Sequence, residues 1–135
     1  MNVADPGPKT GRCACGAVSY EAQGPFRTVS FCHCETCRRQ SSNYVSATAV
    51  ASENLTVTGA DNLGEWQATP HAVRRFCKTC ASLLFWQGTG TDSVSIMTGS
   101  MDLPTGMEAG CHIYVAEKGD YYEICDGLPQ FPEGA

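Results

Sequence analysis

The chain has 135 residues, a formal net charge of −5 and a charged fraction of only 17%. This length fits one domain, and we expect a single domain over residues 1–135. The acidic balance argues against a nucleic-acid partner, which normally requires a basic surface. No apolar run reaches the roughly 18 residues of a membrane span, and residues 1–11 lack the apolar stretch of a secretory signal peptide. We therefore expect a cytoplasmic protein with no membrane partner.

Short apolar runs separated by glycine and proline are typical of many short strands. Several runs are rich in valine, threonine, tyrosine and phenylalanine, which suit a pleated surface. In chain order, the pattern predicts strands at 17–22 and 28–31, a short helix at 35–41, and strands at 44–50, 55–58, 64–68, 72–76, 83–87, 94–97, 111–115 and 121–125. No segment keeps a helical period over three turns. The predicted fold class is mostly β, with a tail at 127–135 that wraps the surface without regular structure.

Nine cysteines are an unusual number for a chain of this length. An odd count in tight clusters, without a signal peptide, favours metal binding over the disulfide framework of a small secreted protein. The clustered cysteines are Cys13, Cys15, Cys32, Cys34, Cys37, Cys77 and Cys80. Two cysteines on either side of a C-x-x-C turn direct both sulfurs to one ion, and zinc prefers four ligands in a tetrahedron. Cys111 and Cys125 each stand alone in an apolar run, so we expect both to be core residues.

The seven clustered thiols divide as four plus three, and the spacing leaves two partitions open. The pair at 34 and 37 could join the pair at 77 and 80 in an ordinary zinc ribbon. Alternatively, the pair at 13 and 15 joins the pair at 77 and 80, which leaves Cys32, Cys34 and Cys37 as a compact triad. The second partition uses each cluster whole, and we prefer it. A site with three protein ligands leaves the fourth zinc position open, as catalytic zinc sites do.

The three histidines are expected to be structural rather than catalytic. His33 lies between two candidate ligands, so on an extended segment its side chain points away from their metal. His71 follows a proline in a loop and is expected at the surface, while His112 is expected at the start of a strand. His33 and His112 are the two whose roles most need a test.

Several motifs in this order resemble the glutathione-dependent formaldehyde-activating enzyme family. They are Gly-Arg-Cys-Ala-Cys-Gly-Ala-Val-Ser-Tyr at 11–20, Cys-His-Cys-Glu-Thr-Cys-Arg-Arg at 32–39, Phe-Cys-Lys-Thr-Cys at 76–80, His-Ile-Tyr-Val at 112–115 and Asp-Gly-Leu-Pro-Gln-Phe at 126–131. The resemblance covers about residues 11–131, which would be the core of the domain. One departure is Ala81, where the family commonly has glycine.

The resemblance implies a β-tent of stacked antiparallel sheets and two zinc ions per chain. It assigns a structural zinc to the cysteines at 13, 15, 77 and 80, and a catalytic zinc to Cys32, Cys34 and Cys37. It also implies a carbon–sulfur lyase that acts on S-hydroxymethylglutathione, the adduct of glutathione and formaldehyde. Arg38 and Arg39 follow the triad directly and are candidates to bind the carboxylates of such a substrate, because the guanidinium fork matches a carboxylate.

Two other functions remain open on the sequence alone. One is a zinc-stabilised binding module of the same fold, in which the triad is completed by a partner or has no catalytic role. The other is a thiol redox sensor, because zinc held by three thiolates is released when those thiols are oxidised. The alternative interpretation of Arg38 and Arg39 is that they are solvated surface charges.

Overall fold

The computed structural model describes residues 7–135. Residues 1–6, which belong to the expected domain and to the segment without an apolar stretch, lie outside the described part. No helix within the described part is long and apolar enough to cross a membrane. The elements are β1 (Lys9–Arg12), β2 (Ser19–Ala22), β3 (Val29–Cys32), α1 (Glu35–Ser41), β4 (Val45–Ala51), β5 (Leu55–Thr58), β6 (Leu63–Thr69), β7 (Ala72–Cys77), β8 (Leu83–Gly88), β9 (Ser93–Met97) and β10 (Ala109–Ile113), with short 3-10 turns at Ser52–Asn54, Ala60–Asn62, Thr98–Ser100 and Val115–Glu117.

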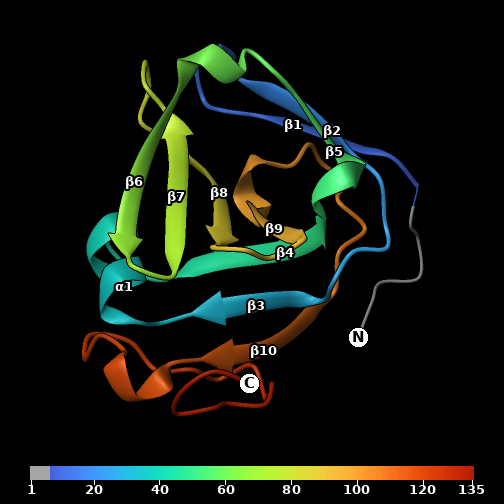
Figure 1. The fold of residues 1–135 in the computed structure, drawn as a ribbon. Helices are drawn as coiled ribbons and strands as arrows, with labels where there is room; N and C mark the ends of the chain where they lie inside the picture. The colour runs from blue at the N-terminus through green and yellow to red at the C-terminus, as the bar shows by residue number, and fades with distance from the viewer. Residues whose placement is uncertain (1–6) are drawn as a thin grey trace.

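The strands form two sheets, and the predicted mostly β fold of stacked sheets is confirmed. β1, β2 and β5 make a three-stranded sheet, and the other seven strands follow the order β10-β3-β4-β9-β8-β7-β6. Neighbouring strands are antiparallel except β10 and β3, which are parallel. In Figure 1, β6 and β7 run across the direction of β3, β4 and β10, which gives the large sheet its strong bend.

Two predictions about individual strands are wrong. The sequence pattern missed β1, because Lys-Thr-Gly-Arg has no apolar alternation. It is a strand because it pairs along its whole length with β2, and Gly11 leaves room for the ring of Tyr20. The predicted strand at 121–125 is absent, since Tyr122 packs through its side chain against other elements instead of joining a sheet.

The main hydrophobic core is built from side chains of both sheets. Its fully buried members include Val18 and Ala22 from the small sheet, and Leu84, Phe85 and Ile96 from the large one. Two of the clustered cysteines, in the turn after β1 and at the end of β7, also belong to this core. A smaller cluster joins the buried Cys37 of α1 to β4 and β9. The hydrophobic core therefore reaches both groups of cysteines.

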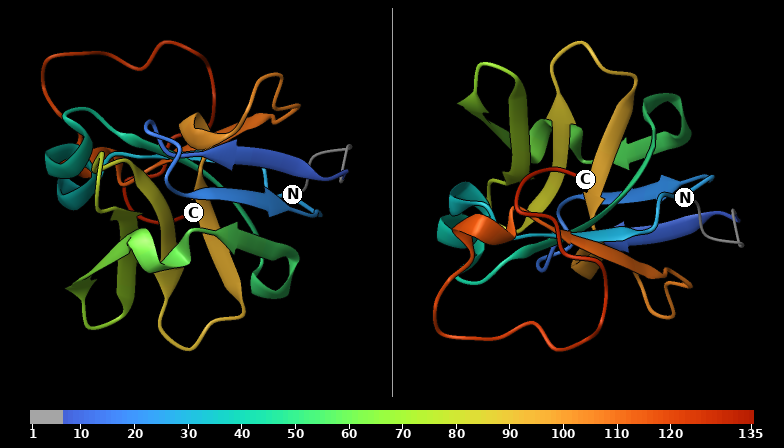
Figure 2. Two further views of the ribbon diagram at one scale, coloured as in Figure 1. Left: turned by 90° about the horizontal axis from the view of Figure 1, so that it is seen from above. Right: turned by 90° about the horizontal axis from the view of Figure 1, so that it is seen from below.

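The chain after β10 crosses the outside of the molecule as a long loop and then returns to the edge of that strand (Figure 2). The return is held by backbone hydrogen bonds. His112 donates to Pro129, Phe131 donates back to His112, and Tyr114 donates to Glu133, each over 2.9 Å. The expectation that residues 127–135 lie on the surface without regular structure is confirmed, and these contacts keep the tail in one place.

Candidate metal centres

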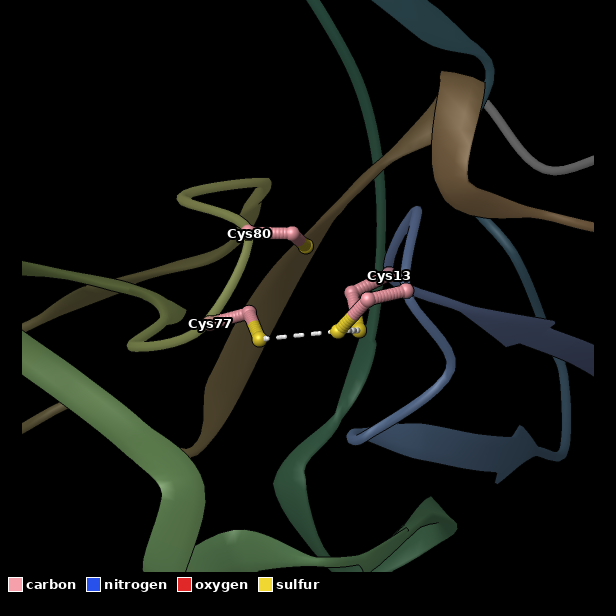
Figure 3. A group of neighbouring side chains, drawn as sticks. Cys13, Cys77 and Cys80 are labelled. Atoms are coloured by element: carbon pink, nitrogen blue, oxygen red, sulfur yellow. Dashed lines mark hydrogen bonds between the residues drawn. The ribbon is translucent and has the colours of Figure 1, made fainter.

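The first cysteine group lies where two turns of the chain meet. Cys13 and Cys15 belong to the turn between β1 and β2, and Cys77 and Cys80 to the turn between β7 and β8. Figure 3 shows Cys13 across from Cys77 and Cys80. The four sulfurs lie within 4.8 Å of one another, and two of the separations are 3.7 Å. A tetrahedron with zinc–sulfur bonds of about 2.3 Å has edges of about 3.8 Å. The spacing therefore fits one zinc ion.

Neighbouring groups donate hydrogen bonds to these sulfurs, which suits thiolates better than thiols. The backbone N–H of Val18 reaches Cys13 Sγ over 3.3 Å, and the side-chain amide of Asn62 reaches Cys77 Sγ over 3.3 Å. A hydrogen bond with Ser82 lowers the pKa of Cys80 to about 5. Hydrogen bonds to the ionised form of a thiol favour that form, so this group is prepared to hold a cation.

The second group consists of Cys32, Cys34 and Cys37, called the triad below, and it is local in the chain. Cys32 ends β3, Cys34 is the N-cap of α1, and Cys37 lies in the first turn of that helix. Their sulfurs also lie within 4.8 Å of one another. Among the described residues, no histidine, aspartate, glutamate or further cysteine joins this group. Three thiols without a fourth protein ligand would leave one position of a tetrahedral ion free.

Crowding of the three triad sulfurs makes their ionisation unequal. Hydrogen bonds from Cys32 and Cys37 lower the pKa of Cys34 to about 2, and the same sharing raises the pKa of Cys32. One thiolate is thus stabilised by two thiols. A bound divalent cation would deprotonate all three, because metals bind cysteine as thiolate. The structure groups the seven sulfurs as the preferred partition has them, while their action as zinc ligands stays a prediction.

No motif in the sequence indicated Arg74, which reaches the triad from β7. Its side chain is only 6% exposed, and its Nη1 and Nη2 atoms lie 3.5 Å and 3.6 Å from Cys37 Sγ. Nη1 also donates to the side-chain carbonyl of Gln40 over 3.0 Å. Two adjacent arginines occur in this strand, and only the fold shows that Arg74 points inward while Arg75 pairs with Glu65 at the surface.

A hollow of about 490 Å³ lies beside the turn after β1, where one member of the four-cysteine group lines it and no triad cysteine does. Leu83 and Met97 line the hollow, and both also pack in the cluster that contains Cys37. The rest of the lining includes Arg12 and Asp102, so the hollow offers one charge of each sign and an apolar wall. Its volume suits a small organic molecule.

The two arginines after the triad lie on the outer side of α1. Arg39 forms an exposed ion pair with Glu35, with 2.9 Å between Nε and Oε2, and lines a smaller hollow of about 200 Å³ along the helix. Arg38 is half-buried and lies near Tyr122. Burial raises the pKa of the Tyr122 phenol, and the positive charge of Arg38 offsets a part of this rise. Neither arginine lines the larger hollow, so substrate binding by this pair stays a prediction.

Two of the three histidines, His33 and His112, are buried and joined in one hydrogen-bond network. His33 is fully buried, and its Nδ1 is hydrogen-bonded to the hydroxyl of Tyr122. Its Nε2 lies 2.8 Å from Nδ1 of His112. The Nε2 of His112 in turn lies 2.8 Å from a carboxylate oxygen of Asp126. Burial, and then the neighbouring His112, lower the pKa of His33 to about 4. These contacts agree with a structural role, and His71 is exposed as expected.

The two isolated cysteines differ from expectation. Cys111 is only half-buried in β10, and Cys125 is exposed. The expected core position of Cys125 is wrong because residues 121–125 run along the surface and not in a sheet. All nine cysteines are free thiols.

Comparisons with known proteins agree with these features. Residues 8–117 match the family described as glutathione-dependent formaldehyde-activating enzyme. An uncharacterized lyase of Schizosaccharomyces pombe is 33% identical over 122 residues, which cover 90% of this chain and 88% of that protein. The crystal structure of a Rhodobacter sphaeroides protein has the same fold, with a TM-score of 0.60 and 23% identity over 90% of this chain and 98% of the other. This chain therefore belongs to the glutathione-dependent formaldehyde-activating enzyme family.

Proposed function

We propose that this protein is a zinc-dependent carbon–sulfur lyase that acts on a thiol adduct such as S-hydroxymethylglutathione. The observation that carries the proposal is the triad, three clustered sulfurs without a fourth protein ligand among the described residues. A hollow of about 490 Å³ shares Leu83 and Met97 with the cluster that packs around Cys37. The family match and the relative named as a lyase support the same reaction class.

A zinc ion bound to the triad would supply a Lewis acid with one exchangeable position that favours a soft sulfur ligand. In the proposed reaction the carbon–sulfur bond of the adduct breaks, and its electron pair stays on sulfur. The adduct hydroxyl gives its proton to water, so glutathione and formaldehyde are the products. The reverse reaction adds the thiolate to the carbonyl carbon of formaldehyde.

The protein's own contribution is to place the adduct and limit the access of water. Leu83 and Met97 line the hollow and also pack in the cluster that contains Cys37, so we propose that a thiol adduct in the hollow directs its sulfur along this wall toward the triad. Arg12 and Asp102 at the same hollow suit the carboxylates and the ammonium group of a glutathione-like molecule. We propose Arg38 and Arg39 as further carboxylate partners.

The hollow can be tested with Gly99→Phe. Gly99 lines the hollow, and a Cβ atom added there meets nothing within 4 Å, so the larger side chain fits without backbone strain. Formaldehyde release from S-hydroxymethylglutathione should be catalysed by the zinc-replete protein, lost in Cys34→Ser and strongly reduced in Gly99→Phe. Release no faster than the spontaneous decomposition in wild type would overturn the lyase proposal and favour a zinc-stabilised binding module.

Calorimetry with glutathione separates the contributions of the arginines. If Arg38 and Arg39 bind its carboxylates, the Arg38→Ala/Arg39→Ala variant should bind glutathione about tenfold more weakly, which corresponds to the loss of one charge-assisted contact. Unchanged binding would remove the two arginines from the site and leave Arg12 as its cation. An alcohol analogue should not bind, because zinc held by thiolates favours sulfur over a neutral hydroxyl.

A further inference from the structure

We propose that Arg74 is a positioning residue of the triad, whose guanidinium holds the sulfur of Cys37 in a fixed direction and sets how tightly this site binds its metal ion. The inference deepens the proposed function in one respect, since it takes the triad as the reactive metal site. It concerns the chain's own residues, and it does not depend on which adduct the protein uses.

The first observation is the burial of the guanidinium without a carboxylate partner. Arg74 is 6% exposed, and its hydrogen-bond partners among the described residues include no aspartate or glutamate. A buried charge is costly unless it is paired and hydrogen-bonded. The acceptors at Arg74 are the neutral amide of Gln40 and the sulfur of Cys37. The sulfur is the group that can carry the balancing negative charge.

The second observation is the geometry of the contact. Nη1 and Nη2 both face Cys37 Sγ, at 3.5 Å and 3.6 Å, which is a two-donor approach to one sulfur. Such a fork is the arrangement by which arginine, unlike lysine, holds an anionic acceptor in a fixed direction. Cys37 is itself buried, so water does not compete strongly for this sulfur.

The third observation is the shielding of Arg74 within its sheet. Arg74 pairs directly with Trp66 of β6 and with Trp86 of β8, so the two tryptophans lie on the same face at either side of it. Both tryptophans are partly exposed, at 46% and 37%, and Arg74 between them is buried. The interaction between the guanidinium and the sulfur is therefore stronger than it would be in water.

These observations predict how Arg74 acts on a metal site. Three thiolates and one divalent cation leave a net charge of −1, which the guanidinium balances. A thiolate that accepts hydrogen bonds donates less electron density to the metal, and it competes better for the metal against protons. Loss of partners of this kind typically costs about 10–100-fold in metal affinity. We expect a loss of this size when Arg74 is replaced.

The test uses cobalt(II) titration of protein whose triad has been stripped by brief chelation while the four-cysteine group keeps its zinc. Arg74→Met removes the donors and preserves bulk, Arg74→Lys keeps the charge without the fork, and Arg75→Met is the matched control on the opposite face of the same strand. Arg74→Met should bind cobalt about 10–100-fold more weakly, and its thiolate-to-cobalt absorption band should shift to longer wavelength. Arg74→Lys should lie between, and Arg75→Met should match wild type.

Equal affinity and an unchanged absorption band in Arg74→Met would overturn the proposal. A loss shared equally by Arg75→Met would also overturn it, because a general effect on the strand would then explain the result. If Arg74→Met loses the zinc of the four-cysteine group, the Arg74→Lys variant decides: weaker cobalt binding supports the proposal, and wild-type binding overturns it.

Lyase activity is measured separately. Inactive wild-type protein with these cobalt shifts would overturn the proposed function alone, and active protein without them would overturn the role of Arg74 alone.

Discussion

Ala81 closes the second cysteine turn in a left-handed backbone conformation, with φ of 65°, and its N–H donates to the carbonyl of Cys77 over 2.8 Å. This conformation brings the Cβ atom of any L-residue close to the carbonyl oxygen, at a cost of about 1–2 kcal/mol, and glycine avoids the cost. The departure from the family's usual glycine therefore has a physical consequence.

We predict that Ala81→Gly raises the free energy of unfolding by about 0.5–1 kcal/mol, after the greater flexibility of glycine in the unfolded chain is subtracted. Urea denaturation measures the change. Ala14→Gly is a matched control in the first cysteine turn, because Ala14 does not have positive φ and should lose stability on the same substitution. Lower stability in both variants would show that the turn at Ala81 is not strained.

The buried His33 predicts a dependence of stability on pH. Its pKa falls from 6.5 to about 4 on folding, because burial disfavours the charged ring. The unfolded chain thus binds a proton in a range where the folded chain does not. The stabilising contribution is complete above pH 6.5 and is lost progressively as the pH falls from 6.5 to 4.

We expect wild type to lose more of its unfolding free energy than His33→Gln between pH 7 and pH 4.5. Denaturant unfolding at each pH measures this difference, and protonation of the cysteines affects both proteins alike. Parallel losses in the two proteins would mean that His33 keeps an ordinary pKa in the folded state.

At the scale of elements, the two cysteine groups differ in what they join. The four-cysteine group connects the β1–β2 turn to the β7–β8 turn, two segments far apart in the chain, and two of its members lie in the main core. The triad spans only the junction of β3 and α1. A metal ion in the first group therefore closes a long loop of chain, whereas one in the triad closes almost none.

We predict that Cys80→Ser damages folding and that Cys34→Ser mainly damages activity. Structural zinc contributes roughly 10–16 kcal/mol in small zinc domains, comparable with the whole stability of a domain at about 5–15 kcal/mol. Melting followed by circular dichroism should show a large loss for Cys80→Ser and a small one for Cys34→Ser. Similar losses in the two variants would mean that the roles of the two groups are reversed or shared.

The helix and most strands could be predicted from the sequence, and one strand could not. The helix at Glu35–Ser41 was predictable to the residue, because it is a polar segment that follows the cysteine pair at its start. Most strands were predictable to within one or two residues from short β-branched and aromatic runs. β1 was not, because its strand character comes from pairing with β2 and not from its own residues.

The same limit applies to the candidate site. The grouping of cysteines could be preferred from the sequence, since a division into four and three that keeps each cluster whole was one of the two partitions that the spacing left open. The inward arginine was not, because Arg38 and Arg39 stand next to the triad in sequence while Arg74 is 37 residues from the sulfur that it contacts. The register of β7 in the sheet decides that Arg74 and not Arg75 faces Cys37 of α1, and register is a property of the whole sheet.

For the whole molecule, the central claim is that one fold carries two metal sites with different tasks. The four-cysteine group has a complete set of ligands and is tied into the core, so its ion should exchange slowly. The triad offers a free position, so its ion should be accessible to small chelators as well as to substrate. The two ions should therefore differ in how easily they are lost.

The most direct test is the zinc content of the purified chain, measured by elemental analysis before and after brief treatment with a chelator, with Cys34→Ser measured in parallel. The account predicts two zinc ions per chain before treatment and one after it, with one ion in Cys34→Ser throughout. A wild-type content of one zinc ion per chain that never rises when zinc is added would contradict the account.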